Sequence, residues 1–184
     1  LISLVRQGFE RFKIADIDAF EMKNMNRQFG GRTDTVGRQK VEVMKEEALK
    51  INPNCHIEVF TEGVQPDNVD IFLSGVDLAI DAIDLFEVAT YRMFFTEAHK
   101  RNIPVLFAAP IGFSTTFLIF KPGGPTFDQY FSINDDTPYF DKMAHFLMGL
   151  MPSMLQRPYM DENNVSLKER RGPSSIGSVN LCAG

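Results

Sequence analysis

Hydrophobic residues recur along most of the chain in two periods, and each period predicts one kind of element. Short runs that alternate or are apolar throughout predict β-strands, whereas apolar positions three or four residues apart predict amphipathic helices. Strands are expected at residues 12–18, 55–61, 76–83, 105–109 and 115–120. Helices are expected from Leu1 to Gly8 and at residues 36–51, 67–74, 86–101 and 141–151. The chain therefore alternates strand and helix over most of its length.

This alternation predicts the fold class. Repeats of strand and helix at this spacing build parallel sheets whose two faces are covered by helices. We therefore expect an α/β fold with a Rossmann-like, doubly wound and mostly parallel sheet, helices on both faces, and a C-terminal insertion or lid. In such folds ligands bind at the carboxyl ends of the strands.

A change of composition after residue 121 predicts how the chain is divided. Half of the ten prolines lie in residues 122–172, together with several aromatic residues. We expect residues 1–121 to form the Rossmann-like core and residues 122–172 to form an insertion, a lid or a partner-contact region. Residues 173–184 are expected to begin a helix that returns to the core.

Composition and charge exclude several classes of protein. Of the 184 residues, 44% are hydrophobic and 23% charged, which is typical of a folded domain rather than a disordered chain. The formal net charge of −5 argues against electrostatic binding of nucleic acid as the main role. The sequence contains no run of 18 apolar residues, so no membrane span is predicted. The 17 phenylalanines are expected to pack mainly in the core.

Cysteine and histidine give no sign of a structural metal. The two cysteines are too few for a disulfide framework or a four-thiolate zinc site, and we expect a cytoplasmic location. Cys55 lies in a predicted strand and is expected in the core, and Cys182 is expected to be structural. The histidines show no ligand spacing and are expected to have surface or core roles: His56, His99 and His145.

Polar side chains lie at the carboxyl ends of several predicted strands or just after them, where a doubly wound sheet would gather them in one crevice. They are Asp16, Asp18, Asn24, Arg27, Lys40 and Asp84. An acid at a strand end can bind ribose hydroxyls, two cations can bind a polyphosphate, and a carboxylate can bind magnesium. Simpler roles stay open, because an aspartate can cap a turn, Arg27 can pair with a surface acid, and Lys40 can be a solvated helix residue.

The order of these residues carries more information than any one of them. It reads Asp16-x-Asp18, Asn24-x-x-Arg27-Gln28, Val36-Gly37-Arg38-Gln39-Lys40, Ile51-Asn52-Pro53 and Asp81-Ala82-Ile83-Asp84. This series resembles the ThiF/MoeB/HesA family, the bacterial relatives of ubiquitin-activating enzymes. The resemblance covers roughly residues 1–121 and resumes weakly at residues 174–177.

The resemblance implies an ATP-dependent adenylyltransferase, in which a carboxylate attacks the α-phosphate of ATP to form an acyl-adenylate and release pyrophosphate. At the matching positions, Asp16 would bind the ribose, and Asn24 and Arg27 would contact the phosphates. Lys40 would neutralise charge on the α-phosphate and the leaving group, and Asp84 would bind magnesium. Arg27, Lys40 and Asp84 are thus the catalytic candidates, and no protein nucleophile is required.

The chain also departs from the family pattern in three ways. The family's first strand and G-x-G-G-x-G turn have no counterpart, so we expect a chain truncated before residue 1, without the loop that cradles phosphate. The C-x-x-C pairs that hold zinc in many relatives are absent, so no zinc is expected. No cysteine lies between Ala109 and Arg171, where relatives that form a thioester place one, so adenylation without a thioester step is expected.

The leading hypothesis for the acceptor is the C-terminal glycine of a ubiquitin-like or sulfur-carrier protein. Residues 51–55, 65–69 and 80–84 are also similar to the tRNA threonylcarbamoyladenosine dehydratase branch, and nucleic acid is a partner only under this alternative. A non-catalytic partner subunit of an activating enzyme would be expected to lose the charged residues. A dinucleotide oxidoreductase would give Arg27 and Lys40 no role.

The resemblance also implies a homodimer, since relatives usually form one. The stretch from Phe140 to Met154 is rich in methionine and phenylalanine, and it is a candidate contact surface. A membrane partner is not expected.

Overall fold

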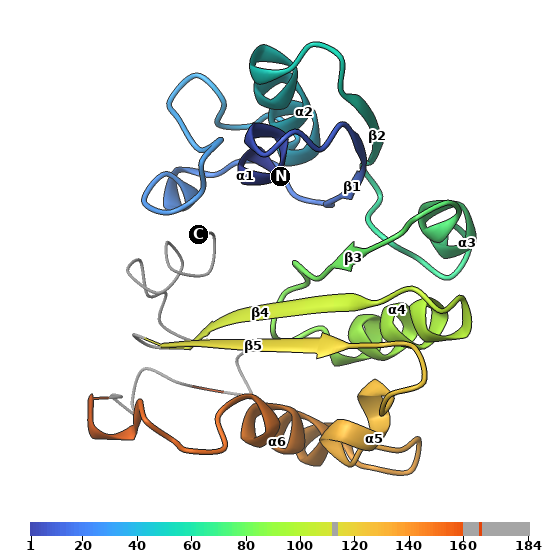
Figure 1. The fold of residues 1–184 in the computed structure, drawn as a ribbon. Helices are drawn as coiled ribbons and strands as arrows, with labels where there is room; N and C mark the ends of the chain where they lie inside the picture. The colour runs from blue at the N-terminus through green and yellow to red at the C-terminus, as the bar shows by residue number, and fades with distance from the viewer. Residues whose placement is uncertain (112–113, 160–165, 167–184) are drawn as a thin grey trace. The chain divides into compact units, whose positions relative to one another are not determined.

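The computed structural model describes residues 1–111, 114–159 and 166, and these residues form two compact units (Figure 1). The first unit contains Leu1–Asn68, and the second contains the described residues from Val69 onward. Each unit has its own sheet and its own helices. None of the described helices is both long enough and apolar enough to span a membrane. Cys182 and the helix expected at residues 173–184 lie outside the described residues.

The first unit is a strand–helix–strand arrangement preceded by a short helix. Its elements in chain order are α1 (Ile2–Arg6), β1 (Arg11–Ala15), the 3₁₀ turn η1 (Met22–Asn24), α2 (Lys40–Ile51) and β2 (His56–Phe60). β1 and β2 pair in parallel, from Arg11 opposite His56 to Ala15 opposite Phe60. Parallel neighbours need a crossover connection, and α2 lies in that connection.

Apolar side chains from α1, α2 and the start of β2 form the core of the first unit. Val5, Ala48, Cys55 and Ile57 are buried in one cluster, and apolar side chains of β1 pack against it. The expected core position of Cys55 is therefore confirmed.

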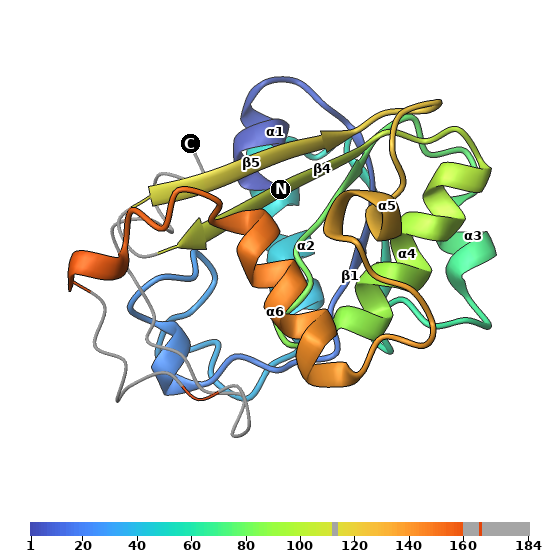
Figure 2. The ribbon, with the colours of Figure 1, turned by 90° about the horizontal axis from the view of Figure 1, so that it is seen from below.

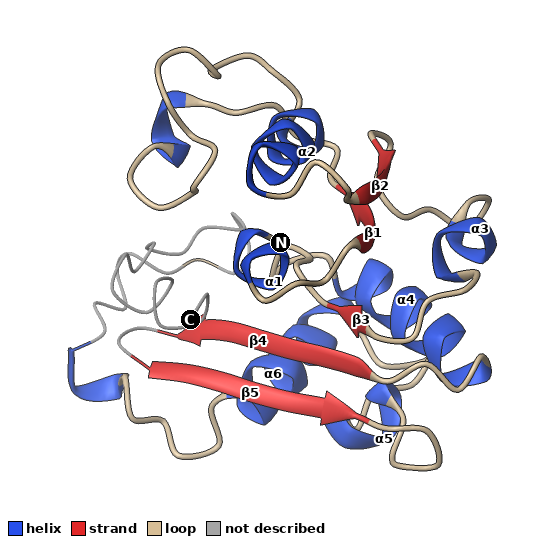
Figure 3. Ribbon diagram, turned by 45° about the horizontal axis from the view of Figure 1, so that its top comes forward, coloured by secondary structure: helices blue, strands red, loops and turns tan. Residues whose placement is uncertain are grey.

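The second unit contains a three-stranded sheet in the order β3-β4-β5. Its elements are α3 (Val69–Leu73), β3 (Ala79–Ile80), α4 (Val88–Lys100), β4 (Val105–Ile111), β5 (Ser114–Phe120), α5 (Phe127–Phe131), α6 (Tyr139–Leu150) and η2 (Arg157–Tyr159). β3 and β4 are parallel, whereas β4 and β5 are antiparallel. Figure 3 shows β4 and β5 as the long strands of this sheet.

The helices α4, α5 and α6 lie along one face of the sheet of the second unit (Figure 2). Aromatic side chains of these helices and of β4 contact one another and fill the core of this unit. Tyr91 of α4 contacts four phenylalanine rings at centroid distances between 4.9 and 6.1 Å; they belong to Phe95, Phe107, Phe127 and Phe146. Ring pairs at such distances contribute both buried area and favourable edge and face contacts. Much of the high phenylalanine content is therefore used in this core, as the composition predicted.

One predicted boundary is wrong in a way that matters for the site. The helix predicted from residue 36 begins at Lys40, because the segment before it has another conformation. Gly37 has a φ of +86°, which favours glycine, and its N–H donates to Phe20 O at 2.8 Å. Lys40 is thus the first residue of the helix rather than part of its second turn.

Three other details of the second unit differ from the sequence prediction. The strand predicted at residues 76–83 is reduced to Ala79–Ile80, since only these two residues pair with β4. β5 is antiparallel because two residues join it to β4, and so short a link does not permit a parallel crossover. The short helix α5 was not predicted, although the capping box formed by Thr126 and Gln129 was an available signal.

Candidate functional site

The carboxyl end of β1 carries a turn that contains two aspartates. Asp16 follows the last residue of β1, and its N–H still donates to Phe60 O of β2 at 3.3 Å. The Oδ1 atom of Asp16 accepts a hydrogen bond from Asp18 N–H at 2.9 Å. Asp16 therefore does cap a turn, and this turn keeps both carboxylates at the end of the sheet.

Lys40 contacts this turn from the first position of α2. Its N–H donates to Asp18 O at 2.9 Å, and its Nζ lies 2.7 Å from Asp18 Oδ2 and 3.8 Å from Asp16 Oδ2. The Lys40 side chain is only 12% exposed, so Lys40 is not a solvated helix residue. An ammonium group that binds carboxylate oxygens can also bind phosphate oxygens.

Asn24 and Arg27 lie in the loop between β1 and α2. Asn24 is buried, and its Oδ1 accepts a hydrogen bond from Glu21 N–H at 2.8 Å, which caps η1. Arg27 Nη1 donates to Lys23 O and to Asn26 Oδ1, both at 3.0 Å. In the described part of the chain no carboxylate forms an ion pair with Arg27. Its guanidinium group therefore keeps donors for an anionic ligand.

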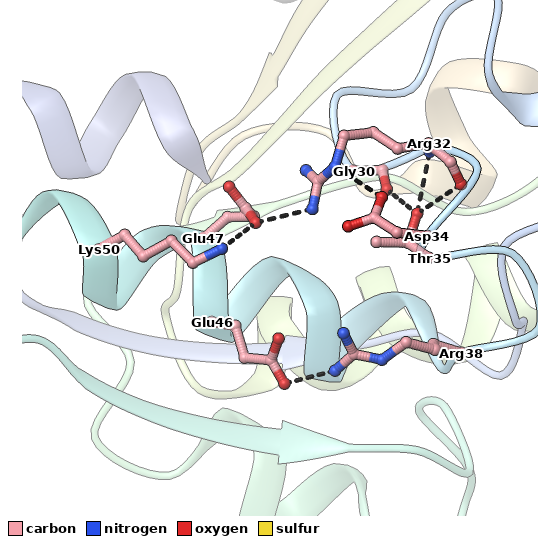
Figure 4. Close-up of polar contacts among 8 residues, drawn as sticks. All are labelled: Gly30, Arg32, Asp34, Thr35, Arg38, Glu46, Glu47 and Lys50. Carbon is pink, nitrogen blue, oxygen red and sulfur yellow. Dashed lines mark hydrogen bonds and ion pairs between the residues drawn. The ribbon is translucent and has the colours of Figure 1, made fainter.

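Two ion pairs attach the later part of this loop to the side of α2 (Figure 4). Arg32 Nη2 lies 3.1 Å from Glu47 Oε1, and Arg38 pairs with Glu46. Lys50, one turn after Glu46, also contacts Glu47 Oε1, at 2.7 Å. Lys50 and Arg32 hold the pKa of the Glu47 carboxyl below its usual value. The loop is thus held in a defined conformation against the helix that Lys40 begins.

A buried threonine stabilises the same loop from within. The hydroxyl of Thr35 donates to Gly30 O at 2.6 Å and accepts a hydrogen bond from Arg32 N–H at 2.9 Å. The residue has no exposed surface. Thr35 was not predicted to have a role, although the Gly30-Gly31 pair in the sequence is a signal of a compact turn.

Asp84 lies in the second unit, in the loop between β3 and α4. It is exposed, and its Oδ1 accepts a hydrogen bond from Phe86 N–H at 3.0 Å. Its backbone carbonyl accepts a hydrogen bond from Glu87 N–H at 3.0 Å, just before α4 begins. In the described residues neither an ion pair nor a second hydrogen bond engages its other carboxylate oxygen. That oxygen is available to a ligand.

Asp81 and Tyr91 hold the same loop, and neither was predicted to have a role. Asp81 is 8% exposed, and burial raises its pKa to about 7. Tyr91 is 2% exposed and its hydroxyl donates to Ile83 O at 2.6 Å. Burial, followed by the charges of Asp81 and Asp84, raises the pKa of Tyr91. Its hydroxyl is therefore protonated and acts as a hydrogen-bond donor at physiological pH.

The raised pKa of Asp81 predicts an unusual dependence of stability on pH. Because the folded state favours the protonated carboxyl, ionisation destabilises the fold between pH 3.8 and about 7, and the full cost is present above that range. Asp81→Asn is therefore expected to be more stable than the unmodified chain at pH 8, by at most ~4 kcal/mol, with the difference vanishing near pH 4. Urea denaturation at several pH values between 4 and 8 measures the difference in the free energy of unfolding between the two proteins. Asp136→Asn, at an exposed position of the same unit, is the control; a pH-independent difference for Asp81→Asn would contradict the prediction.

The structure brings together some of the predicted site residues. Asp16, Asp18 and Lys40 are in direct contact at the carboxyl end of β1. Asn24 and Arg27 lie in the loop that connects β1 to α2. Asp84 lies in the second unit, so its convergence with Lys40 stays a prediction.

Residues 1–156 match the ThiF family over most of the chain. The chain belongs to this family. The family predicted from the order of the polar motifs is therefore confirmed. The ThiF-family chain spans less than half the length of the curated relatives it matches.

Two curated relatives show how similar this ThiF-family chain is in sequence to other proteins. The tRNA threonylcarbamoyladenosine dehydratase of Escherichia coli (strain K12) is 41% identical over 105 residues, which are 56% of this chain and 38% of that protein. A probable molybdopterin-synthase adenylyltransferase of Pyropia yezoensis is 27% identical over 143 residues, which are 76% of this chain and 37% of that protein.

A solved structure extends the similarity to the fold. The crystal structure of the E. coli dehydratase, TcdA, in complex with ATP superposes with a TM-score of 0.56 at 33% identity, over 60% of this chain and 45% of that one. The Rossmann-type α/β class predicted from the sequence is thereby confirmed for this ThiF-family chain.

Proposed function

We propose that this chain is an ATP-dependent adenylyltransferase that activates a carboxylate. The observation that carries the proposal is the position of Lys40, a largely buried ammonium group at the start of α2, shared by the two aspartates that follow β1. A cation at the carboxyl end of a parallel strand, beside a helix N-terminus, is well placed to bind phosphate. Membership of the ThiF family, and similarity to a dehydratase solved with ATP, support ATP as the nucleotide.

In the proposed reaction an oxygen of the acceptor carboxylate forms a bond to the α-phosphorus of ATP. The bond from that phosphorus to the oxygen that bridges to the β-phosphate breaks, and pyrophosphate leaves with its electron pair. Lys40 exchanges its contact with Asp18 for an α-phosphate oxygen and neutralises the charge that develops there. Arg27 binds the departing phosphates through its free donors.

The remaining two residues of the first unit position the nucleotide. Asp16 accepts hydrogen bonds from the ribose hydroxyls, since its carboxylate lies at the strand end and is 38% exposed. Asn24 holds the conformation of the loop through its Oδ1 and offers its amide nitrogen to the phosphates. The chain needs no nucleophile of its own, because the acceptor provides the attacking oxygen.

Magnesium fits the chemistry of Asp84. This ion is usually held by one or two carboxylates together with substrate phosphates rather than by an all-protein cage. Asp84 offers one exposed carboxylate oxygen, and no group of three or more His, Cys, Asp or Glu is arranged for a metal ion in the part of the chain that is described. When bound with the nucleotide, the ion supplies positive charge to the phosphate oxygens.

The names of the relatives favour a tRNA acceptor over a carrier-protein acceptor. The relatives at 31% to 41% identity are named tRNA threonylcarbamoyladenosine dehydratases, whereas those named molybdopterin-synthase adenylyltransferases are less similar, at 27% to 30%. We therefore propose a carboxylate on a modified tRNA base as the first acceptor to test, and the C-terminal glycine of a carrier protein as the second.

We also propose that residues 122–172 contact a partner or a second copy of the chain. α6 and the segment after it expose several large apolar side chains, which are Tyr139, Phe140, Met148, Met154 and Leu155. Their presence supports the predicted interface between Phe140 and Met154.

Nucleotide binding and acceptor-dependent turnover test the proposal. ATP with magnesium is expected to raise the thermal midpoint of the chain by several degrees, because a ligand that binds only the folded state stabilises it. NAD is expected to leave the midpoint unchanged. Pyrophosphate release from ATP should then increase when tRNA that carries threonylcarbamoyladenosine is added, and not with a carrier protein that ends in Gly-Gly. A shift with NAD but not with ATP would overturn adenylyl transfer, and stimulation by the carrier protein alone would exchange the order of the acceptors.

A further inference from the structure

Hydrogen bonds to the backbone N–H and C=O of Ile83 hold the loop that carries Asp84, the next residue. Ile83 N–H donates to Asp81 Oδ1 at 2.9 Å, and Ile83 O accepts the hydroxyl hydrogen bond of Tyr91 at 2.6 Å. Asp81 is itself anchored, since its N–H donates to Leu106 O of β4 at 2.8 Å. The carbonyl that Tyr91 binds belongs to the planar peptide group that also contains the N–H of Asp84. The hydrogen bond from Tyr91 therefore constrains the backbone at Asp84 directly.

The position of the Tyr91 hydroxyl is determined by the core and not by the loop. The ring of Tyr91 is stacked on Phe127 of α5 at 5.9 Å and 12°, and it contacts Phe107 of β4 and Phe146 of α6. These rings come from three separate elements, so the tyrosine cannot move without displacing several buried neighbours. A rigid side chain thus connects the aromatic core to the loop.

A phenylalanine would fill almost the same volume in this core, so packing alone does not account for a tyrosine. Burying a hydroxyl group is unfavourable unless it forms a hydrogen bond. Here the cost is compensated by a short bond to a single backbone carbonyl, one residue before the predicted magnesium ligand. The hydroxyl therefore has a local effect on the loop that the ring does not provide.

We propose that Tyr91 is a positioning residue, whose hydroxyl holds the Ile83–Asp84 peptide so that the Asp84 carboxylate is kept in one conformation for binding magnesium. This role rests on the proposed function of Asp84. Tyr91 does not touch nucleotide or acceptor in this proposal. It reduces the number of conformations that Asp84 must lose when it binds a ligand.

Tyr91→Phe tests this role, with Tyr130→Phe as the matched control. Tyr130 also belongs to the aromatic cluster, and its hydroxyl also donates to a backbone carbonyl, that of Gly149 at 3.3 Å, but on α6 instead of the loop. Hydrogen exchange in the 184-residue chain without ligand is the first measurement. The amides of Ile83 and Phe86 are expected to exchange about 3- to 10-fold faster in Tyr91→Phe, as the loss of one hydrogen bond predicts. Tyr130→Phe should leave these two amides unchanged.

The magnesium dependence of pyrophosphate release is the second measurement. In Tyr91→Phe the magnesium concentration for half-maximal rate is expected to rise about 3- to 10-fold, while the rate at saturating magnesium and the ATP dependence stay close to those of the unmodified chain. A purely structural role would lower the thermal midpoint without this selective shift.

The outcomes separate the two proposals. Equal amide exchange and equal magnesium dependence in Tyr91→Phe and Tyr130→Phe would overturn the positioning role. Absence of magnesium-dependent turnover in the unmodified chain would overturn the proposed function. Selective acceleration of Ile83 and Phe86 exchange would still support the action of Tyr91 on the loop, because that measurement needs neither metal nor nucleotide.

Discussion

Replacing Asp84 with asparagine is expected to lower magnesium-dependent pyrophosphate release by about 10²- to 10³-fold. Asparagine keeps an Oδ1 atom that can accept the hydrogen bond from Phe86 N–H, so the loop should keep its conformation. What is lost is the carboxylate charge and the second oxygen, which is replaced by an amide nitrogen that cannot bind magnesium. Initial rates measured over a range of magnesium concentrations test this expectation.

Two further measurements make the Asp84 result specific. Asp136→Asn removes an exposed carboxylate from a loop of the same unit and is expected to leave the rate unchanged. The thermal shift caused by ATP without magnesium should be similar in Asp84→Asn and in the unmodified chain. If Asp84→Asn keeps its full rate with the same magnesium dependence, Asp84 is not the metal ligand.

Lys40→Met is expected to lower the rate by at least ~10²-fold and to remove the thermal shift caused by ATP. The substitution deletes the ammonium group that would contact the α-phosphate, and it leaves the carboxylates of Asp16 and Asp18 without their cation. Two uncompensated negative charges would then repel the triphosphate. The turnover rate and the thermal shift caused by ATP are therefore both expected to decrease in Lys40→Met.

Lys45→Met is the matched control for Lys40→Met, because it removes the same charge from the same helix. It is expected to change neither turnover nor ATP binding by more than about twofold, since five residues along α2 turn its side chain to another side of the helix, away from Asp16 and Asp18. Lys40→Arg adds a second comparison, because it keeps the charge but replaces a compact ammonium group with a wider planar one. Similar behaviour of Lys40→Met and Lys45→Met would show that the phosphate does not bind at Lys40.

The pattern of hydrophobic positions located the helices and strands of the first unit, although β1 ends at Ala15 and not at residue 18, so Asp16 and Asp18 follow the strand. Helix α2 ends at the expected residue, and β2 lies within the expected range. The start of α2 was misplaced because Val36 fits an apolar helix position, whereas the glycine at position 37 adopts a positive φ. Local periodicity does not register such a backbone conformation, which is stabilised by a hydrogen bond to Phe20, distant in sequence.

The candidate site was only partly predictable. Asp16 and Lys40 were singled out by their place after a strand and before a helix, and the contact through Asp18 follows from the crossover that joins β1 to α2. Tyr91 was not singled out, because a tyrosine on an apolar helix face is typical of any core. Its effect on Ile83 depends on how α4 packs against the loop.

The amino-acid sequence by itself determined the class of fold, the family and the identity of the polar residues, since periodicity and motif order are properties of a linear chain. The tertiary structure decided which groups meet. The ammonium of Lys40 reaches a carboxylate 22 residues away, and the hydroxyl of Tyr91 reaches a carbonyl eight residues away in the loop before its helix. The physical reason is that a hydrogen bond requires two atoms within about 3 Å of each other, and packing between elements, rather than sequence spacing, sets that distance.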